Sequence, residues 1–179
     1  MNFKFRETNI ENLKVVEPRA FEDSRGYFFE SYKFSDFEQN GISQKIIQVN
    51  QSFSSKNVVR GLHFQKGEYA QAKLVRCLSG KVYDVAVDLR KNSKTFGQHF
   101  GVELSSENKL MLYIPIGFAH GFSVLSDTAE ISYNVFGGEY NKESEGGLRF
   151  DDTDLKIDWQ VETPLVSEKD QELPFLKDF

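Results

Sequence analysis

Cysteine, proline, methionine and tryptophan are all scarce in this sequence of 179 residues. Cys77 is the only cysteine, so no disulfide can form within the chain, which suits a reducing compartment. No apolar run approaches membrane-spanning length, and residues 1–18 lack the apolar segment of a signal peptide. We therefore expect a cytoplasmic protein that makes no contact with a membrane.

The sequence also lacks an excess of basic residues. Its formal net charge is −5, which argues against nonspecific nucleic-acid binding, because such binding requires a basic face. A local arginine cluster can still bind a small anion, whatever the total charge. The length and the absence of linkers or repeats predict one domain over residues 1–179.

Alternating apolar residues predict strands along most of the chain. In residues 81–90, one face carries Tyr83, Val85, Val87 and Leu89, and the other carries Val82, Asp84, Ala86 and Asp88. Ser79 and Gly80 separate this strand from the one before it, which indicates a hairpin. Helix signals are few: residues 34–41, with Ser35 as cap and Gly41 as end, and a turn or two within 165–176. Many short strands favour an all-β sandwich or barrel of the jelly-roll kind, with a few short peripheral helices.

The sequence has three histidines, and His63 lies in the stretch RGLHFQ. A lone histidine in a strand-rich protein is often structural, but a catalytic role fits as well. Barrels of this kind can hold a metal with two histidines one residue apart, yet Gly61 and Gln65 flank His63 at that spacing. We therefore predict no metal site. His99 lies beside a turn and is predicted to be a surface residue.

Three further side chains fit either a structural or a chemical role. Lys73 shares a strand face with Val75 and Cys77, so it either reaches past them to water or serves as a functional cation. His120 lies between two glycines, at a barrel corner or facing a ligand. Tyr133 should point inward, either as core or as a proton donor across a cavity from His63.

Residues 17–32 combine charged and aromatic side chains. A surface hairpin explains the pattern without any function. A nucleotide site also explains it, because Arg25 suits phosphate, Glu30 suits a ribose or base, and Phe28 suits stacking.

Seven segments in order give the chain a specific resemblance. They are F-x-D-x-RG-x-FFES (21–31), Q-x-N-x-S (48–52), RGLHFQ (60–65), AKLVRC-x-x-G-x-V-x-DVAVD-x-R (72–90), IP-x-GFAHGF (114–122), EG (145–146) and S-x-KD (167–170). With them the chain resembles the dTDP-4-dehydrorhamnose 3,5-epimerase family from about Glu17 to Leu173. The resemblance implies a cupin-type jelly roll, a homodimer, and catalysis without metal or organic cofactor. It implies a dTDP-linked 4-keto-6-deoxy sugar as substrate, in dTDP-L-rhamnose and surface polysaccharide synthesis.

The resemblance also implies catalytic roles. His63 is the base, and a carboxylate orients it: Asp170 by the family match, with Asp84 as second choice. Lys73 stabilises the enolate, and Tyr133 is the acid on the far side of the sugar.

Substrate-binding roles follow from the same resemblance. Arg25 and Arg60 bind the diphosphate, and further contacts to the substrate come from Phe28, Glu30, Gln48, Asn50, His120, Tyr140, Glu145 and Lys169. In the family, the tyrosine matched by Tyr140 stacks on thymine. The loop at 134–147 departs from the family pattern, with one extra residue and with Lys142 where proline is common.

Three alternatives stay open at the level of sequence. The chain could epimerise only C3 or only C5 of a related keto sugar, because the same base, cation and acid serve either reaction. It could bind a sugar nucleotide without turnover. A metal-dependent cupin oxygenase is disfavoured by the absent histidine pair.

Overall fold

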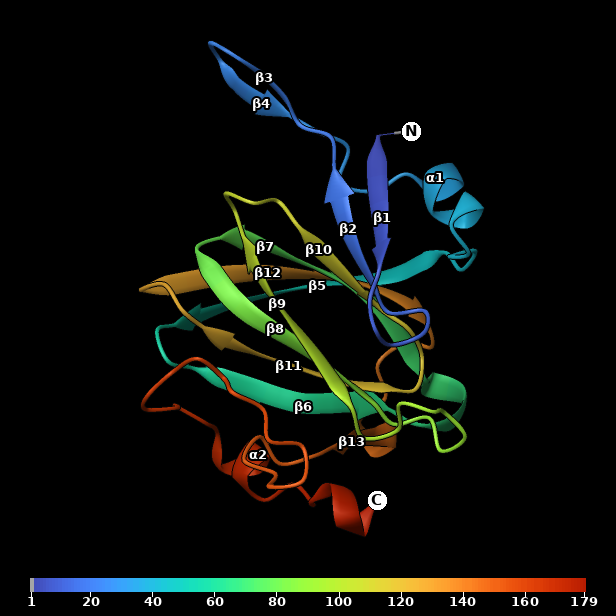
Figure 1. Cartoon of the computed structure of the whole chain (residues 1–179), viewed down its shortest axis with the longest axis vertical. Coiled ribbons are helices and arrows are strands. Elements are labelled where there is room, and N and C mark those ends of the chain that lie inside the picture. Colours follow the sequence, from blue (N-terminus) through green and yellow to red (C-terminus); the bar gives the residue numbers. More distant parts are fainter. Residues whose placement is uncertain (1) are drawn as a thin grey trace.

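The computed structural model describes residues 2–179, which form two antiparallel sheets that face each other (Figure 1). The six-stranded sheet has the order β1 (Phe3–Glu7), β2 (Lys14–Pro18), β10 (Met111–Ile114), β7 (Gln71–Ser79), β12 (Thr128–Gly137) and β5 (Ile46–Ser55). The five-stranded sheet has the order β13 (Glu145–Gly147), β6 (Val59–Gln65), β11 (Phe118–Val124), β8 (Lys81–Asp88) and β9 (His99–Ser105). The predicted all-β jelly roll is confirmed.

The helices are short and peripheral, as predicted. They are α1 (Phe34–Gln39), α2 (Glu168–Gln171) and the 3₁₀ turns η1 (Gly67–Tyr69), η2 (Lys142–Ser144) and η3 (Leu176–Asp178). The prediction that Ser35 caps α1 is wrong. The helix begins at Phe34, so the cap lies two residues earlier, at Lys33, whose side chain makes no capping hydrogen bond. Ser35 therefore lies inside the first turn.

The main hydrophobic core fills the space between the two sheets. It includes Val75 and Cys77 of β7, Val82 and Ala86 of β8, and Ile131 of β12. A second cluster packs α1 against the outside of the six-stranded sheet, and a third packs the C-terminal segment against the outside of the five-stranded sheet. Because both faces of the five-stranded sheet are covered, the polar residues on its inner face are enclosed.

The hairpin predicted at Ser79 and Gly80 is wrong. β7 and β8 lie in different sheets, so this turn carries the chain from one sheet to the other. Gly80 has φ 77°, and a Cβ there would lie 2.1 Å from the carbonyl oxygen of Thr128, so the crossing requires glycine. Alternation in sequence marks a strand but not its neighbour, which is why the pattern misled. The crossing brings Lys73 and Asp84 to the inner faces of opposite sheets.

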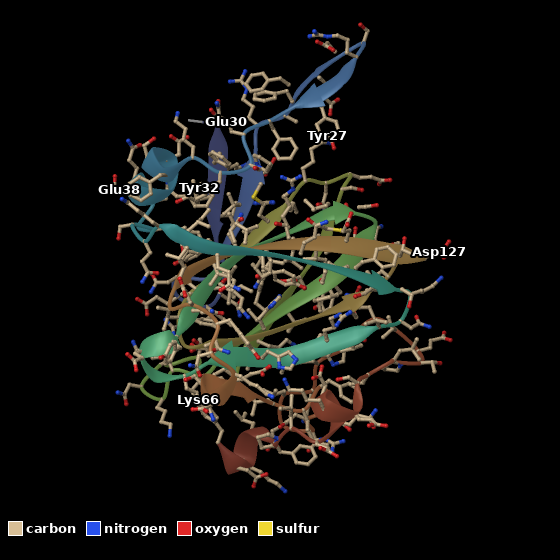
Figure 2. The ribbon with its side chains drawn as sticks, turned by 180° about the vertical axis from the view of Figure 1, so that it is seen from behind. Tyr27, Glu30, Tyr32, Glu38, Lys66 and Asp127 are labelled. Carbon is tan, nitrogen blue, oxygen red and sulfur yellow. The ribbon has the colours of Figure 1, made fainter. Side chains whose placement is uncertain are left out.

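A separate hairpin, β3 (Phe21–Asp23) and β4 (Gly26–Phe28), projects from the body of the molecule (Figure 1). All six residues of its two strands are exposed. Figure 2 shows Tyr27 and Glu30 at this end, whereas Lys66, which follows β6, lies at the other. Of the two readings of residues 17–32, the structure shows the surface hairpin, formed by residues 21–28.

Candidate active site

A cavity of about 430 Å³ lies between the two sheets and is bordered by the C-terminal segment. The predicted site residues that line it are Asn50, Arg60, His63, Lys73, His120, Tyr133, Tyr140, Glu145, Lys169 and Asp170. The lining residues that sequence reasoning missed are Gln51, Ser52, Phe64, Gln65, Gln71, Phe122, Val135 and Ser167. Several of these share a strand face with a predicted residue, so strand alternation was the signal that could have found them.

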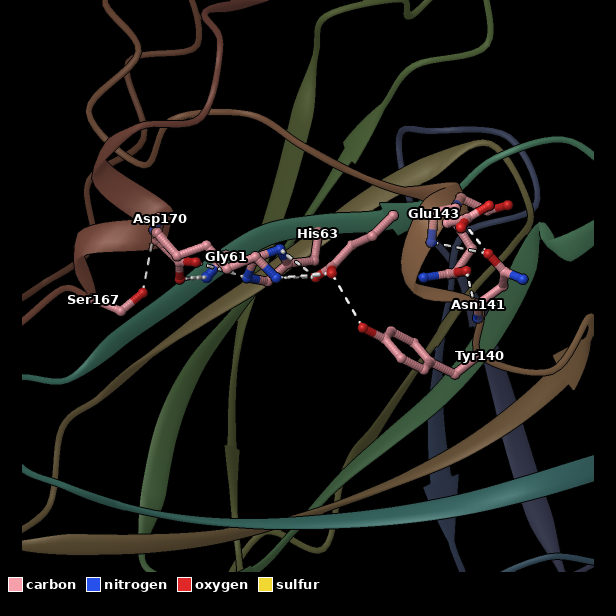
Figure 3. A network of polar contacts seen from close by, with 11 residues as sticks. Gly61, His63, Tyr140, Asn141, Glu143, Ser167 and Asp170 are labelled. Atoms are coloured by element: carbon pink, nitrogen blue, oxygen red, sulfur yellow. Dashed lines mark hydrogen bonds and ion pairs between the residues drawn. The ribbon is translucent and has the colours of Figure 1, made fainter.

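The imidazole of His63 is oriented by a carboxylate, as Figure 3 shows. Its Nε2 lies 3.1 Å from Oδ1 of Asp170, while Oδ2 of Asp170 accepts a hydrogen bond from the backbone N–H of Gly61 at 3.1 Å. Ser167 caps α2 by accepting from the backbone N–H of Asp170. Burial opposes ionisation of Asp170, but the bonds from His63 and Gly61 outweigh it and lower the pKa of this carboxyl. Asp170 is thus an anion that holds the Nε2 proton and leaves the lone pair on Nδ1.

A second carboxylate faces the other nitrogen of His63. Nδ1 has no hydrogen-bond partner among residues 2–179, and Oε1 of Glu145 lies 3.7 Å from it. Lys169 donates to both oxygens of Glu145 at 2.8 Å, and the Tyr140 hydroxyl donates to Oε2 at 3.2 Å (Figure 3). Burial raises the pKa of Glu145, but Lys169, His63 and Tyr140 lower it by more. The base therefore lies between two ionised carboxylates.

The second-choice partner for His63, Asp84, pairs with a different histidine. Its Oδ2 lies 2.9 Å from Nε2 of His120, and both side chains are buried. The reason is topological, because β8 pairs with β11, which carries His120, and not with β6, which carries His63. Oδ1 of Asp84 is buried without a hydrogen-bond partner in the described chain. Asp84 does not itself line the cavity, but it holds His120, which does.

Lys73 lies on the inner face of β7, among the apolar residues predicted for that face. Burial lowers the pKa of its ammonium from 10.5 to about 8, although Asp84 and Glu145 oppose the change. At neutral pH Lys73 is still a cation. It therefore places positive charge and up to three N–H donors at the cavity.

Tyr133 points inward from β12, as predicted, and lies in the sheet opposite to the one that carries His63. Its hydroxyl lies 2.9 Å from that of Ser52, and its ring meets the ring of His120 edge-on at 6.0 Å. Burial raises the pKa of the phenol well above 10. The phenol is therefore protonated at neutral pH and can donate a proton into the cavity.

Four predicted substrate-binding residues do not line the cavity of their own chain. Arg25 and Phe28 lie on the projecting hairpin, where Arg25 pairs with Asp23 at 2.5 Å. Glu30 accepts a hydrogen bond from the side chain of Asn2 at 3.0 Å. Gln48 joins two residues that do line the cavity, because it accepts from the backbone N–H of Tyr140 and donates to Asn50.

His99 also departs from its prediction. It is half-buried within β9, where it pairs with Val87, and is not a surface residue. Burial lowers the pKa of its imidazole. The turn that precedes it in sequence ends at the strand, so a turn signal nearby says little about the exposure of the next residue.

The arrangement suits proton transfer at a carbon. An imidazole held by a carboxylate, a lysine cation and a protonated tyrosine border one cavity, with the imidazole and the phenol on opposite sheets. Removing a proton next to a carbonyl needs a base, a positive charge for the developing oxyanion and an acid to return the proton. Within residues 2–179 we find no group of three metal-ligating side chains placed to hold an ion. No helix of this part of the chain is long and apolar enough to cross a membrane.

Comparisons with known proteins point the same way. Residues 7–178 match the family model described as dTDP-4-dehydrorhamnose 3,5-epimerase. The Escherichia coli K12 protein of that name is 52% identical, over 93% of this chain and 90% of its own length. The crystal structure of the Elizabethkingia anophelis epimerase is 53% identical, with a TM-score of 0.95, and covers 99% of this chain and 98% of its own. A Legionella pneumophila epimerase in complex with dTDP-4-keto-L-rhamnose is 44% identical, with a TM-score of 0.94 over 98% and 93% of the two chains.

Proposed function

Because the chain belongs to the dTDP-4-dehydrorhamnose 3,5-epimerase family, we propose that it inverts C3 and C5 of dTDP-4-dehydro-6-deoxy-D-glucose. The product is dTDP-4-dehydro-L-rhamnose, which a reductase converts to dTDP-L-rhamnose for surface polysaccharides. The observation that carries the proposal is the oriented base His63, facing the protonated Tyr133 across a cavity that also holds Lys73. The whole chain acts as one domain in the cytoplasm.

The reaction begins at a carbon next to the C4 ketone. The lone pair of the His63 imidazole takes the proton, and the electrons of the C–H bond move through C4 to its oxygen, giving an enolate. Asp170 and Glu145 stabilise the imidazolium, and Lys73 stabilises the enolate oxygen. Removing an electrostatic donor of this kind typically costs about 3 to 4 kcal/mol of barrier.

Inversion requires a proton to return from the opposite face of the ring. Tyr133 lies on β12, across the cavity from His63 on β6, so its phenol donates to that face as the enolate collapses to the ketone. The phenolate then recovers a proton from water, and His63 releases its proton. Repetition at the second flanking carbon completes the double epimerisation without any redox change.

The substrate extends from this centre toward Tyr140 and Lys169. Arg60 and Lys169 supply positive charge for the diphosphate, and Asn50 and Tyr140 supply polar and aromatic contacts for the nucleoside. His120 forms part of the wall behind the sugar, with its orientation held by Asp84.

Arg25, Phe28 and Glu30 fit this site only in a dimer. They lie on or beside a hairpin that projects from the body of the molecule (Figure 1), and none of the three lines the cavity of its own chain. That hairpin and the β5 edge expose several large apolar side chains, among them Tyr27, Phe28, Val49 and Phe53. Exposed apolar groups of this kind are typical of a protein–protein interface. We propose a homodimer in which each hairpin reaches the cavity of the partner. Light scattering of the purified protein tests this, with twice the chain mass of 20.6 kDa expected.

Solvent exchange tests the reaction itself. The protein is incubated in D₂O with dTDP-4-dehydro-6-deoxy-D-glucose, and NMR locates deuterium on the sugar. Deuterium at both C3 and C5 is expected, with the L-rhamno product trapped by a reductase. Deuterium at one carbon only means a single-site epimerase. No deuterium, together with tight binding of dTDP, means a binding protein without turnover.

A further inference from the structure

Two glutamines in the cavity wall take no part in the proton transfers above. Gln65 follows His63 by two residues on β6 and is only 8% exposed. Gln71 precedes Lys73 by two residues on β7 and is half-buried. Each therefore shares a strand face with a catalytic side chain, and both line the cavity. Polar groups enclosed in this way require partners.

The loop at residues 138–141 fixes the orientation of both carboxamides. The backbone N–H of Asn141 donates to Oε1 of Gln65 at 3.1 Å. The remaining end of this carboxamide, which can bind a ligand, is therefore the NH₂ group. Nε2 of Gln71 donates to the carbonyl oxygen of Gly138 at 2.9 Å, so the end of Gln71 that remains is its carbonyl. Neither remaining end is bonded to any residue of the described chain.

One loop thus presents a hydrogen-bond donor from Gln65 and an acceptor from Gln71, both at the cavity. Carboxylates and phosphates accept only, and an ammonium group donates only, so each matches one of the two ends. A hydroxyl group accepts and donates at once, and matches both. Because Gln65 and Gln71 lie two residues from the catalytic His63 and Lys73, the part of the ligand that meets the pair is the hydroxylated sugar ring.

We propose that Gln65 and Gln71 determine specificity by binding the C2 hydroxyl of the hexose, which accepts from Gln65 and donates to Gln71. The inference rests on the proposed function. In the keto sugar, C1 carries the diphosphate, C4 is the ketone and C6 is a methyl group, which leaves hydroxyls at C2 and C3. Inversion moves the C3 hydroxyl across the ring, whereas the C2 hydroxyl keeps its configuration. A fixed donor and acceptor suit the group that does not move.

The pair also links the sugar to the nucleotide end of the site. Gln65 and Gln71 hold the loop that carries Tyr140, and the backbone N–H of Tyr140 is held in turn by Gln48. A sugar that lacks the C2 hydroxyl would leave two enclosed polar groups unpaired, and such sites reject the deoxy analogue. With two neutral hydrogen bonds at stake, we expect discrimination of about tenfold or somewhat more.

Calorimetric titration with three stable ligands tests the proposal: dTDP, dTDP-D-glucose and dTDP-2-deoxy-D-glucose. The unmodified protein should bind dTDP-D-glucose about tenfold more tightly than the 2-deoxy analogue. In Gln65→Met the ratio should fall to about threefold or less. Loss of the bond to the Asn141 N–H weakens the binding of both sugar nucleotides alike, so it cancels in this ratio. Gln51→Met is the matched control. Gln51 also lines the cavity, but its carboxamide donates to Glu130, so the tenfold ratio should persist.

The outcomes separate the possible errors. Equal affinity of the unmodified protein for the two sugar nucleotides overturns the proposal, and this comparison needs no variant to fold. If Gln65→Met loses affinity for dTDP-D-glucose and its 2-deoxy analogue by the same factor, so that the tenfold ratio persists, the glutamine only anchors the loop and the proposal is wrong. Failure of the proposed function is detected independently, as absence of deuterium exchange on the keto sugar by the unmodified protein.

Discussion

Replacing Lys73 by methionine should make the protein more stable and nearly inactive. Methionine has a similar length and no charge, so it fills the same place on β7 without a buried ammonium. Burial lowers the pKa of Lys73 from 10.5 to about 8. At about 1.4 kcal/mol per tenfold change in acidity, this fall corresponds to about 3 kcal/mol of destabilisation at pH 7.

The stability gained by Lys73→Met should be smaller than about 3 kcal/mol, because Lys73 borders a cavity that admits water. We expect Lys73→Met to add about 2 kcal/mol to the free energy of unfolding, which is about 4 to 8 °C in Tm for a domain of this size. Turnover should fall about 100- to 1,000-fold, as it does when an electrostatic donor to an oxyanion is removed. Scanning calorimetry and the deuterium-exchange assay measure the two effects.

The pH dependence has a definite sign. Below about pH 8 Lys73 is protonated in both the folded and the unfolded chain, so the full destabilisation is present. Between about 8 and 10.5 the unfolded chain binds more protons, so the stability contributed by this group rises with pH. The stability difference between Lys73→Met and the unmodified protein should therefore shrink at pH 9.5. The exposed Lys94→Met is the control and should change neither stability nor turnover. A variant less stable than the unmodified protein, or a difference independent of pH, refutes the reasoning.

Three further predictions concern the base, the acid and the dimer. Asp170→Asn should lower kcat about a thousandfold or more, because asparagine can donate to His63 Nε2 and so favour the tautomer that carries its proton on Nδ1. A kcat within threefold of normal would contradict the role of Asp170 as the group that orients His63. Tyr133→Phe should slow inversion more than deuterium uptake, because His63 can still return a deuteron to the face from which it took the proton. NMR of the recovered sugar measures both rates. Equal slowing of the two would count against Tyr133 as the acid. Mixing the inactive variants His63→Ala and Arg25→Ala should restore about a quarter of normal activity. About half of the randomly paired dimers are mixed, and each mixed dimer has one intact site out of two. No recovery would exclude a site shared between the subunits.

The sequence predicted the strands well and their partners poorly. Alternation identified the faces of β7, β8 and β12, because side-chain direction follows directly from strand geometry. The turn at Gly80 looked like a hairpin, because turn residues mark a change of direction and do not reveal which sheet receives the next strand. The cap of α1 was missed because the helix begins at Phe34 after Lys33, which makes no capping bond with its side chain, so no capping residue marks the start in the sequence.

The site shows the same division. His63, Lys73 and Tyr133 could be found from local patterns, and the family resemblance paired His63 with Asp170. The partner of Asp84 could not be found, because the pairing of β8 with β11 joins residues far apart in sequence. The bonds from Lys169 and Tyr140 to Glu145 likewise depend on how three separate segments meet.

The separation of His63 and Asp170 along the chain also governs when a newly made molecule becomes reactive. His63 is synthesised with the early strands, but α2, which carries Asp170, follows only after every strand of both sheets has been made. A nascent or truncated chain therefore has an imidazole without its orienting carboxylate. Activity therefore requires the polypeptide to be complete through α2. Proteolytic loss of this segment should abolish activity even where the two sheets remain folded.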